Sequence, residues 1–276
     1  MADKVAFIAL TNSSFNQEEL MFDFFSEQYK DLYSLYIHNK NPIASDYFQQ
    51  FEIPSEYKVN TEWGKYSLVL ATTRLLRCAL QNPDNQKFVL ISESHCPIYN
   101  IKETCRLIFE RYQILSFSDQ PNEQRLSISR FKSLIRDQNR NPFDVNHAKF
   151  VSQWFVCNRS DAEIFVNHEA KLRKYFNINK LCFADELYFH LIARHFNLEI
   201  QYKNSCYFNW NLKSSKKMIN LGCRKTPKTY EKISKNFIDI LRNSTDSIFM
   251  RKVCAATQID RHYILNECKT NNKTNS

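Results

Sequence analysis

The sequence predicts an α/β fold with a mostly parallel central sheet. The prediction rests on short, mostly apolar runs at residues 4–10, 32–38 and 88–92, separated by longer segments with helical spacing of apolar residues. Strands of a parallel sheet are covered on both faces, so they lack the polar/apolar alternation of a half-exposed strand. A strand-helix-strand order of this kind is typical of right-handed βαβ units.

Local signals justify the individual elements. Asn16, with Glu19 three residues later, has the pattern of a capping box and predicts a helix that ends near Tyr29. Residues 39–61 are a polar connection, and 65–80 form a helix that stops at an Asn-Pro-Asp-Asn turn signal. The remaining expected elements are helices at 100–112, 160–175, 187–196 and 230–241, strands at 150–156 and 198–202, and a closing apolar segment at 248–253.

Two segments lack the apolar patterns that are typical of core helices and strands. Residues 118–149 are polar and lack periodicity, which predicts a long surface excursion that is either disordered or a functional lid. The end of the chain, 269–276, is polar and predicts a disordered tail. With no repeat and no interior linker, residues 1–268 are expected to form one domain.

Composition narrows the classes of function. The formal net charge is +9 and the pI near 9.0, which is compatible with nucleic acid, anionic lipid or a phosphorylated small molecule as partner. Basic residues crowd between 213 and 235, either as a solvated face or as a phosphate site. The only glycines are Gly64 and Gly222, which excludes the Gly-rich loops of Rossmann dehydrogenases and P-loop NTPases.

Membrane and metal signals are absent from the sequence. No apolar run approaches the roughly 18 residues of a membrane span, and the run at 5–10 is too short for a signal peptide, so a cytoplasmic protein is expected. The 9 cysteines show no CxxC spacing, which favours reduced thiols. His190 and His195 lack a third ligand, and we expect no metal site.

The stretch from 88 to 100 has the sequence FVLISESHCPIYN, a buried strand that ends in small polar and acidic residues. Ligands in α/β proteins bind where the carboxyl ends of parallel strands open into loops, which makes Ser92, Glu93 and Ser94 candidate pocket residues. The alternative is an ordinary core strand followed by a polar loop.

Several segments, in order, resemble the Core-2/I-branching glycosyltransferases, glycosyltransferase family 14, which also includes the peptide O-xylosyltransferases. The resemblance covers residues 4–253, from VAFIALT to IFMRKV, and its most specific parts are the Ser-Glu-Ser loop at 92–94, the Gln-Trp-Phe motif at 153–155 and the Asp-Glu pair at 185–186. It implies a GT-A-like domain that transfers a sugar from a UDP-sugar to a hydroxyl of a glycan or glycoprotein acceptor. The transfer would invert the anomeric carbon and use no divalent metal. The donor sugar, GlcNAc or xylose, and the acceptor are left open.

The resemblance assigns roles to charged residues. Glu186 of the Asp-Glu pair matches the general base, a task that suits a carboxylate at the mouth of a pocket. Its alternative is an ordinary carboxylate at a helix start, and Asp185 is expected to shape the loop or hold an acceptor group. The sequence has no Asp-x-Asp, so the UDP charge would fall to Lys252, helped by Arg251, and to an upstream residue, Arg224 or Lys225.

Further pocket residues follow from the same resemblance. Trp63, Gly64, His38 and Thr11 are assigned to the donor side, where a missing side chain at Gly64 would let the sugar nucleotide approach closely. The alternatives are a core Trp63 beside a glycine at a helix start, and a structural role for His38. Trp154 is assigned to the acceptor side or to a structural role. The segment 118–149 matches the family poorly, and we expect no counterpart of the membrane anchor that secretory members carry.

Two other classes of function compete with the transferase. A non-catalytic module derived from this fold could bind glycans or scaffold other proteins, although the matches at Glu186 and Lys252 favour an enzyme. A nucleic-acid-binding protein is supported by the charge alone, because no known nucleic-acid motif is present, and we do not expect a nucleic-acid partner.

Overall fold

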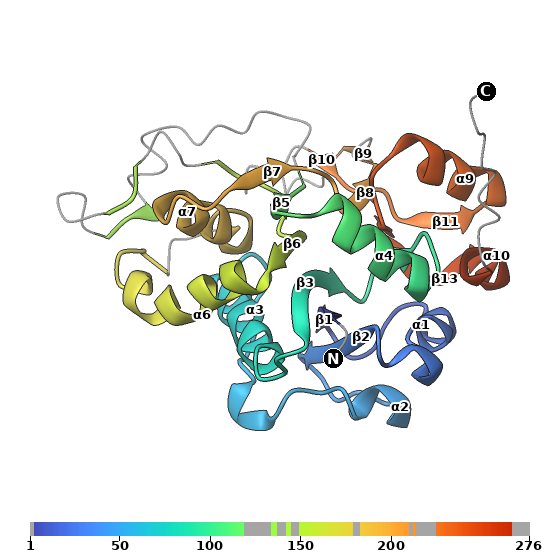
Figure 1. Cartoon of the computed structure of the whole chain (residues 1–276), viewed down its shortest axis with the longest axis horizontal. Helices are drawn as coiled ribbons and strands as arrows, with labels where there is room; N and C mark the ends of the chain where they lie inside the picture. The colour runs from blue at the N-terminus through green and yellow to red at the C-terminus, as the bar shows by residue number, and fades with distance from the viewer. Residues whose placement is uncertain are drawn as a thin grey trace.

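The computed structural model of the chain (Figure 1) describes residues 3–118, 134–136, 142–144, 149–178, 183–209, 212–213 and 225–266. The expected tail at 269–276 lies outside the described residues, as does most of the segment 118–149. The domain boundary at 268 therefore stays a prediction.

A six-stranded sheet with the order β2-β1-β3-β6-β5-β7 forms the centre of the molecule. Strands β1, β2 and β3 run parallel, β6 runs antiparallel to both β3 and β5, and β7 is parallel to β5. This mostly parallel α/β architecture confirms the predicted fold class. The strand bounds are β1 Lys4–Thr11, β2 Tyr33–Asn39, β3 Asn85–Ser92, β5 Leu115–Phe117, β6 Phe155–Asn158 and β7 Ile200–Tyr202.

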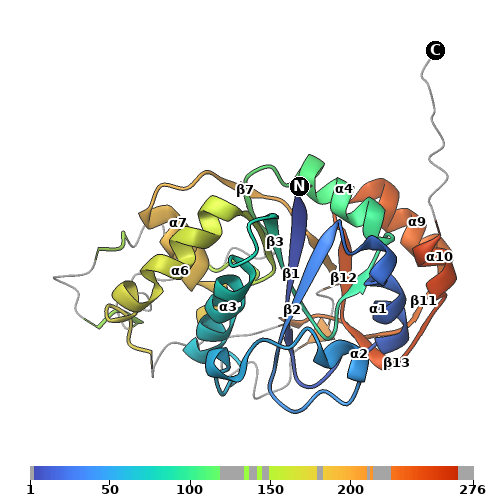
Figure 2. The ribbon, with the colours of Figure 1, turned by 60° about the horizontal axis from the view of Figure 1, so that its bottom comes forward.

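Helices cover both faces of this sheet. In Figure 2, α3 and α6 lie on one side of β1, β2 and β3, and α1 and α4 lie on the other. The long helices are α1 Glu18–Phe24, α3 Tyr66–Ala79, α4 Ile101–Arg111, α6 Arg159–Arg173, α7 Tyr188–His195 and α9 Lys235–Ser244. The shorter ones are η1 Glu27–Tyr29, α2 Asp46–Gln49, η2 Ser55–Tyr57, η4 Ala184–Glu186 and α10 Arg261–Leu265.

Small sheets attach the C-terminal part of the chain to the central one. Strand β12 (Phe249–Arg251) lies between β4 (Cys96–Pro97) and β8 (Cys206–Phe208). Strands β11 (Tyr230–Ile233) and β13 (Val253–Ile259) pair in parallel, and β9 (Leu212–Lys213) pairs with β10 (Lys225–Thr226). Because β4 comes directly after β3, its pairing with β12 places the Arg251-Lys252 segment at the carboxyl end of β3.

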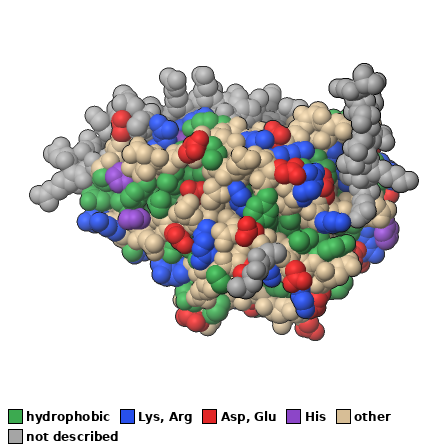
Figure 3. All heavy atoms as spheres, in the orientation of Figure 1, with side chains coloured by type: hydrophobic (Ala, Val, Ile, Leu, Met, Phe, Trp, Pro, Cys, Tyr) green, Lys and Arg blue, Asp and Glu red, His purple; other side chains and the backbone are tan. Residues whose placement is uncertain are grey.

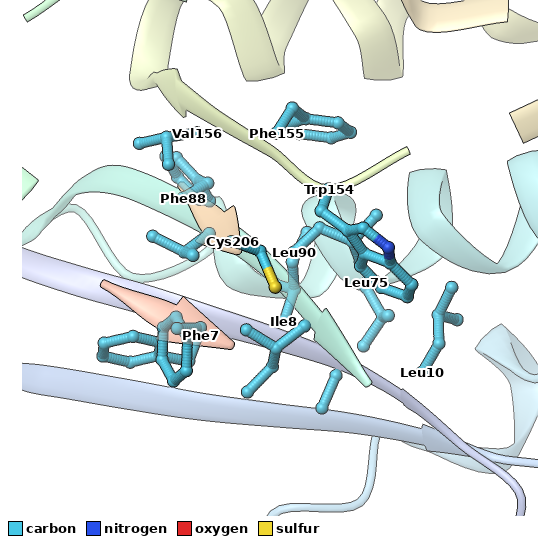
Figure 4. Packing of buried hydrophobic residues seen from close by; sticks show 14 of the residues in the cluster. Phe7, Ile8, Leu10, Leu75, Phe88, Leu90, Trp154, Phe155, Val156 and Cys206 are labelled. Carbon is cyan, nitrogen blue, oxygen red and sulfur yellow. The ribbon is translucent and has the colours of Figure 1, made fainter. Parts of the chain in front are cut away.

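The core is built from the apolar runs that predicted the sheet. Residues 5–9 of β1 and Phe88–Ile91 of β3 are almost fully buried. Figure 4 shows side chains of β1, β3 and β6 packed together in one cluster. Aromatic rings meet edge to face in this core: the ring centroid of Phe7 lies 5.3 Å from that of Phe25 and 6.1 Å from that of Phe249. This geometry adds to the stability that burial of the rings provides.

Several expected boundaries are wrong, and the first is the helix expected to end near Tyr29, because α1 ends at Phe24. The cap of α1 is Gln17, because the side chain of Asn16 donates instead to the carbonyl of Val253. The strand expected at 150–156 is β6, at Phe155–Asn158; the residues at 150–154 are mostly buried but belong to no strand. The helix expected at 230–241 is split, since 230–233 pair with β13 and Ser234 caps α9.

Two further differences concern strand β5 and the start of α6. Strand β5, at Leu115–Phe117, was not expected from the sequence. The cap of α6 is Asn158 rather than a residue from Ser160 onwards: Asn158 and Asp161 form a capping box. Asn158 also accepts a hydrogen bond from Lys87 Nζ, which joins β6 to β3 beyond the backbone ladder.

Lys87→Met should destabilise the fold by about 3 kcal/mol. The buried amine of Lys87 donates to the carbonyls of Tyr112 (2.5 Å) and Gln113 (3.2 Å) as well as to Asn158, so its loss leaves buried acceptors without a partner. Urea denaturation measures the effect. Lys171→Met, at an exposed site on α6, is the control and should change stability by less than about 0.5 kcal/mol. A similar small change for Lys87→Met would contradict the role given to the amine.

Candidate active site

A cleft of about 370 Å³ opens at the carboxyl ends of β1, β2 and β3. This is the edge of a parallel sheet where ligands bind in α/β proteins. The strand ends contribute Thr11, His38 and Ser92 to its wall. Its other lining residues come from distant parts of the chain: Leu10, Asn12, Lys40, Thr61, Trp63, Gly64, Leu68, Glu93, Ser152, Gln153, Trp154, Phe183, Asp185, Glu186, Phe208, Pro227, Arg251 and Lys252.

Most of the residues assigned from the sequence meet in this cleft. Those that line it are Thr11, His38, Trp63, Gly64, Ser92, Glu93, Trp154, Asp185, Glu186, Arg251 and Lys252. Ser94 lies behind the wall, where its Oγ accepts a hydrogen bond from Arg251. Arg224 lies outside the described residues, and of Lys225 the structure describes only the backbone, at the start of β10. The individual roles stay predictions.

The acidic pair sits in a turn held from two sides. Asp185 and Glu186 belong to η4, which precedes α7, so neither lies in the first turn of that helix as the sequence suggested. The carbonyl of Gly64 accepts from the amide of Phe183 at 2.7 Å, and the carbonyl of Glu186 accepts from the amide of Val151 at 2.8 Å. These bonds fix both carboxylates relative to the segment before β6.

Gly64 has a clear backbone reason to be glycine. Its φ is +69°, in the left-handed region that side chains disfavour. The position also lines the cleft, so the close approach of a ligand that the sequence suggested is compatible with the structure. Its neighbour Trp63 is 60% exposed and stands edge-on to Phe183, with 5.3 Å between the ring centroids.

Asp185 is a buried carboxylate with spare hydrogen-bonding capacity. It is 8% exposed, and within the described part of the chain its Oδ1 has no hydrogen-bond partner. Burial raises the pKa of Asp185 to about 6, while backbone hydrogen bonds and the charge of Arg251 act in the opposite direction. Asp185 lines the cleft, and a carboxylate oxygen without a partner can accept a hydrogen bond from a ligand hydroxyl or amine that reaches it.

Two cationic side chains face the acidic ones. Arg251 ends β12 and Lys252 follows it; burial lowers the pKa of each. The guanidinium of Arg251 stacks 4.3 Å above the ring of Trp154, which is a cation–π contact in a desolvated place. The charges of Glu93, Asp185 and Glu186 favour its charged form.

Glu93 and His38 complete the electrostatics of the cleft. Burial raises the pKa of Glu93, and the nearby charges of Arg251 and Lys252 act in the opposite direction. His38 is buried, its Nε2 accepts from the amide of Val59 at 3.0 Å, and burial lowers its pKa. His38 is therefore a neutral imidazole with a structural hydrogen bond at the cleft wall.

Several lining residues were missed by the sequence reasoning. Lys40 lies just past the carboxyl end of β2, a position that could have identified it. Gln153 adjoins Trp154 in the SQWF motif, and its buried Oε1 has no hydrogen-bond partner among the described residues. Phe183 and Phe208 gave no signal, because apolar residues of cleft and core look alike in a sequence.

Three features bear on possible partners: metal-ligating groups, membrane-spanning helices and the distribution of surface charge. No three His, Cys, Asp or Glu side chains are grouped to hold a metal in the described ranges. The helices that the structure describes include none that could cross a membrane. On the face shown in Figure 3, Lys and Arg side chains are interspersed with Asp and Glu side chains.

An α/β domain of this architecture, with its cleft at the ends of the parallel strands, is consistent with a GT-A-like glycosyltransferase. The family model of the Core-2/I-branching enzymes matches residues 5–242, and the chain belongs to this family. Glycosyltransferase BC10 of Oryza sativa subsp. japonica is 25% identical over 180 residues. That alignment covers 62% of this chain and 42% of the rice protein. Membership of this family indicates a glycosyltransferase domain.

Among solved structures, a crystal structure of A197 from STIV is similar over 58% of this chain and 67% of that one. The sequence identity is 11% and the TM-score is 0.28. A TM-score this low does not establish a shared fold.

Asp185→Asn should remove a pH-dependent loss of stability. A carboxyl with a raised pKa holds its proton more tightly in the folded state, so stability falls as pH rises from about 4 to about 6. Relative to the wild type, the variant should therefore gain up to about 3 kcal/mol across this window, at 1.36 kcal/mol per pKa unit. Urea denaturation at several pH values measures the gain.

The exposed Asp31 offers the control, Asp31→Asn. Parallel stability curves for the wild type and Asp185→Asn between pH 4 and 7 would show that Asp185 has an ordinary environment.

Proposed function

We propose that this protein is an inverting glycosyltransferase that moves GlcNAc or xylose from a UDP-sugar to a hydroxyl of a glycan or glycoprotein acceptor. The observation that carries the proposal is one cleft, at the ends of β1, β2 and β3, that contains both a carboxylate and a pair of cations. Glu186 and Asp185 line it from η4, and Arg251 and Lys252 line it from the end of β12.

In the proposed reaction, Glu186 takes the proton from the acceptor hydroxyl as its oxygen attacks the anomeric carbon. The new C–O bond forms on the face opposite the diphosphate, and the bond from the anomeric carbon to the β-phosphate oxygen breaks with its electron pair. UDP leaves with the additional negative charge. A single displacement of this kind inverts the anomeric configuration.

The charge that develops on UDP needs a positive partner. Arg251 and Lys252 are fixed in a partly desolvated cleft, where a cation stabilises a developing anion far more than in water. We propose that these side chains take the place of a divalent metal, with Arg224 or Lys225 as a further cation. Burial near one another disfavours both charges before the donor binds, so an arriving diphosphate relieves an existing cost.

The remaining lining residues divide between donor and acceptor. Thr11, His38, Trp63 and Gly64 are proposed for the donor side. Asp185, with its unpaired oxygen, is the side chain best suited to accept from a sugar hydroxyl. The others proposed for the acceptor pocket are Ser92, Glu93, Ser94 and Trp154.

Turnover should survive removal of divalent metals. Incubation with UDP-GlcNAc or UDP-xylose in EDTA, with UDP release as the measurement, should give the same rate as incubation without the chelator. Water can replace the unidentified acceptor at a low rate. Strict dependence on added Mn²⁺ would contradict the role given to the cations. Binding of UDP-sugars without any turnover would favour the non-catalytic module.

Glu186→Gln should lower the rate of transfer by at least about 100-fold, the usual contribution of a positioned base, while UDP binds almost as tightly as to the wild type. The amide keeps the size of the carboxyl but cannot take a proton. UDP release measures the rate, and isothermal titration with UDP measures the affinity. Transfer at the wild-type rate would show that another residue is the base.

Lys252→Met tests the binding of UDP, whereas Glu186→Gln tests the rate of transfer. Without the ammonium group, UDP should bind more weakly by about tenfold, which corresponds to 1.4 kcal/mol. Lys232→Met, at an exposed position on β11, is the matched control and should leave UDP affinity unchanged.

A further inference from the structure

A buried histidine lies behind the cleft wall. His95 is 1% exposed, and its ring packs edge-on against Trp154 with 4.5 Å between centroids. Its Nδ1 accepts a hydrogen bond from the backbone amide of Ser92 at 2.9 Å. Because an amide N–H can only donate, Nδ1 is the unprotonated nitrogen and Nε2 carries the proton. The imidazole is therefore neutral.

This tautomer fixes the direction of a chain of hydroxyl groups. Ser92 Oγ lies 3.0 Å from Nδ1 and must donate to it, since Nδ1 has no proton to give. Ser94 Oγ lies 3.2 Å from Ser92 Oγ and donates in turn. Arg251 Nη2 donates to Ser94 Oγ at 3.1 Å, and a guanidinium has no acceptor. In this series of hydrogen bonds, each donated proton therefore points from Arg251 towards His95.

Two constraints hold the guanidinium of Arg251. The Cζ atom lies over the Trp154 ring at 4.3 Å from its centroid, and the bond to Ser94 holds one N–H group of the guanidinium. His95 supports both, because it packs against the edge of Trp154 and terminates the hydroxyl chain. Arg251 Nε remains without a hydrogen-bond partner among the described residues, on a side chain that lines the cleft.

We propose that neutral His95 is a positioning residue that aims the guanidinium of Arg251 at the anionic leaving group of the donor. This inference rests on the proposed function, in which Arg251 meets the diphosphate. A protonated imidazole would place an N–H donor against the amide and the hydroxyl of Ser92 and would disrupt the hydrogen bonds between Arg251 and His95. Burial and the charge of Arg251 both lower the pKa of His95, which keeps the ring neutral.

The orientation of Arg251 can be measured without any ligand. In the free protein, ring currents of Trp154 should shift the NMR signal of Arg251 Nε–H upfield, and Arg251→Lys identifies this signal by its loss. In His95→Ala the signal should return to the range of the other arginines. In His95→Asn it should stay shifted, because the amide oxygen of asparagine can occupy the place of Nδ1 as acceptor.

Binding of UDP supplies the second readout. His95→Ala should weaken UDP binding by about tenfold, and His95→Asn by less than about threefold. In an Arg251→Met background, His95→Ala should cause no further loss, since the two residues act through one interaction. His190→Ala is the matched control. This buried histidine does not line the cleft, and its Nε2 lies 2.8 Å from Tyr202 Oη in a hydrogen bond. Its loss should lower Tm without changing UDP affinity.

The outcomes separate the inference from the proposed function. If the wild type does not bind UDP, the proposed function is wrong, and the NMR signal still decides how Arg251 is held. If UDP binds and Arg251→Met weakens it, but His95→Ala changes neither the signal nor the affinity, His95 does not position Arg251. Equal losses in His95→Ala and His95→Asn would also overturn the proposal.

Discussion

The candidate site depends on the attachment of residues 249–253 to the loop after β3. Strand β12 pairs with β4, and the amide of Val253 donates to the carbonyl of Ser94 at 3.0 Å. Asn16 adds a second link, since its side chain donates to the carbonyl of Val253 and its amide to the carbonyl of Glu93. Without these backbone bonds, the cations would have no fixed place beside the ends of β1 and β3.

That attachment brings opposite charges into one partly desolvated space. The charged forms of Arg251 and Asp185 are both disfavoured by burial, and each is favoured by the charge of the other. Such an arrangement costs stability and is typical of functional sites, where groups are held ready for a ligand rather than paired to saturation. Stacking on Trp154 and the hydrogen bond to Ser94 hold the arginine in place against this cost.

The basic character of the chain is best understood from individual side chains rather than from the total. Of the basic residues at 213–235, most lie outside the described residues or have undescribed side chains. Lys235, at the end of this range, is described: its Nζ lies 3.1 Å from Asp260 Oδ2 in an exposed ion pair. Arg251 and Lys252, whose surroundings are described, line the cleft. A compact anion suits this geometry better than an extended polyanion.

The sequence by itself determined the strands β1, β2 and β3, the helices between them, and a list of residues that meet in one cleft. Apolar runs and helical spacing are local properties, so one sequence shows them. Only the tertiary structure decided that 230–233 form a strand and that β4 pairs with β12. It also decided that Arg251 reaches Ser94 across 157 positions and that His95 closes the hydroxyl chain behind them. Pairings between distant residues depend on shape and on hydrogen bonds formed after folding, which no local pattern encodes.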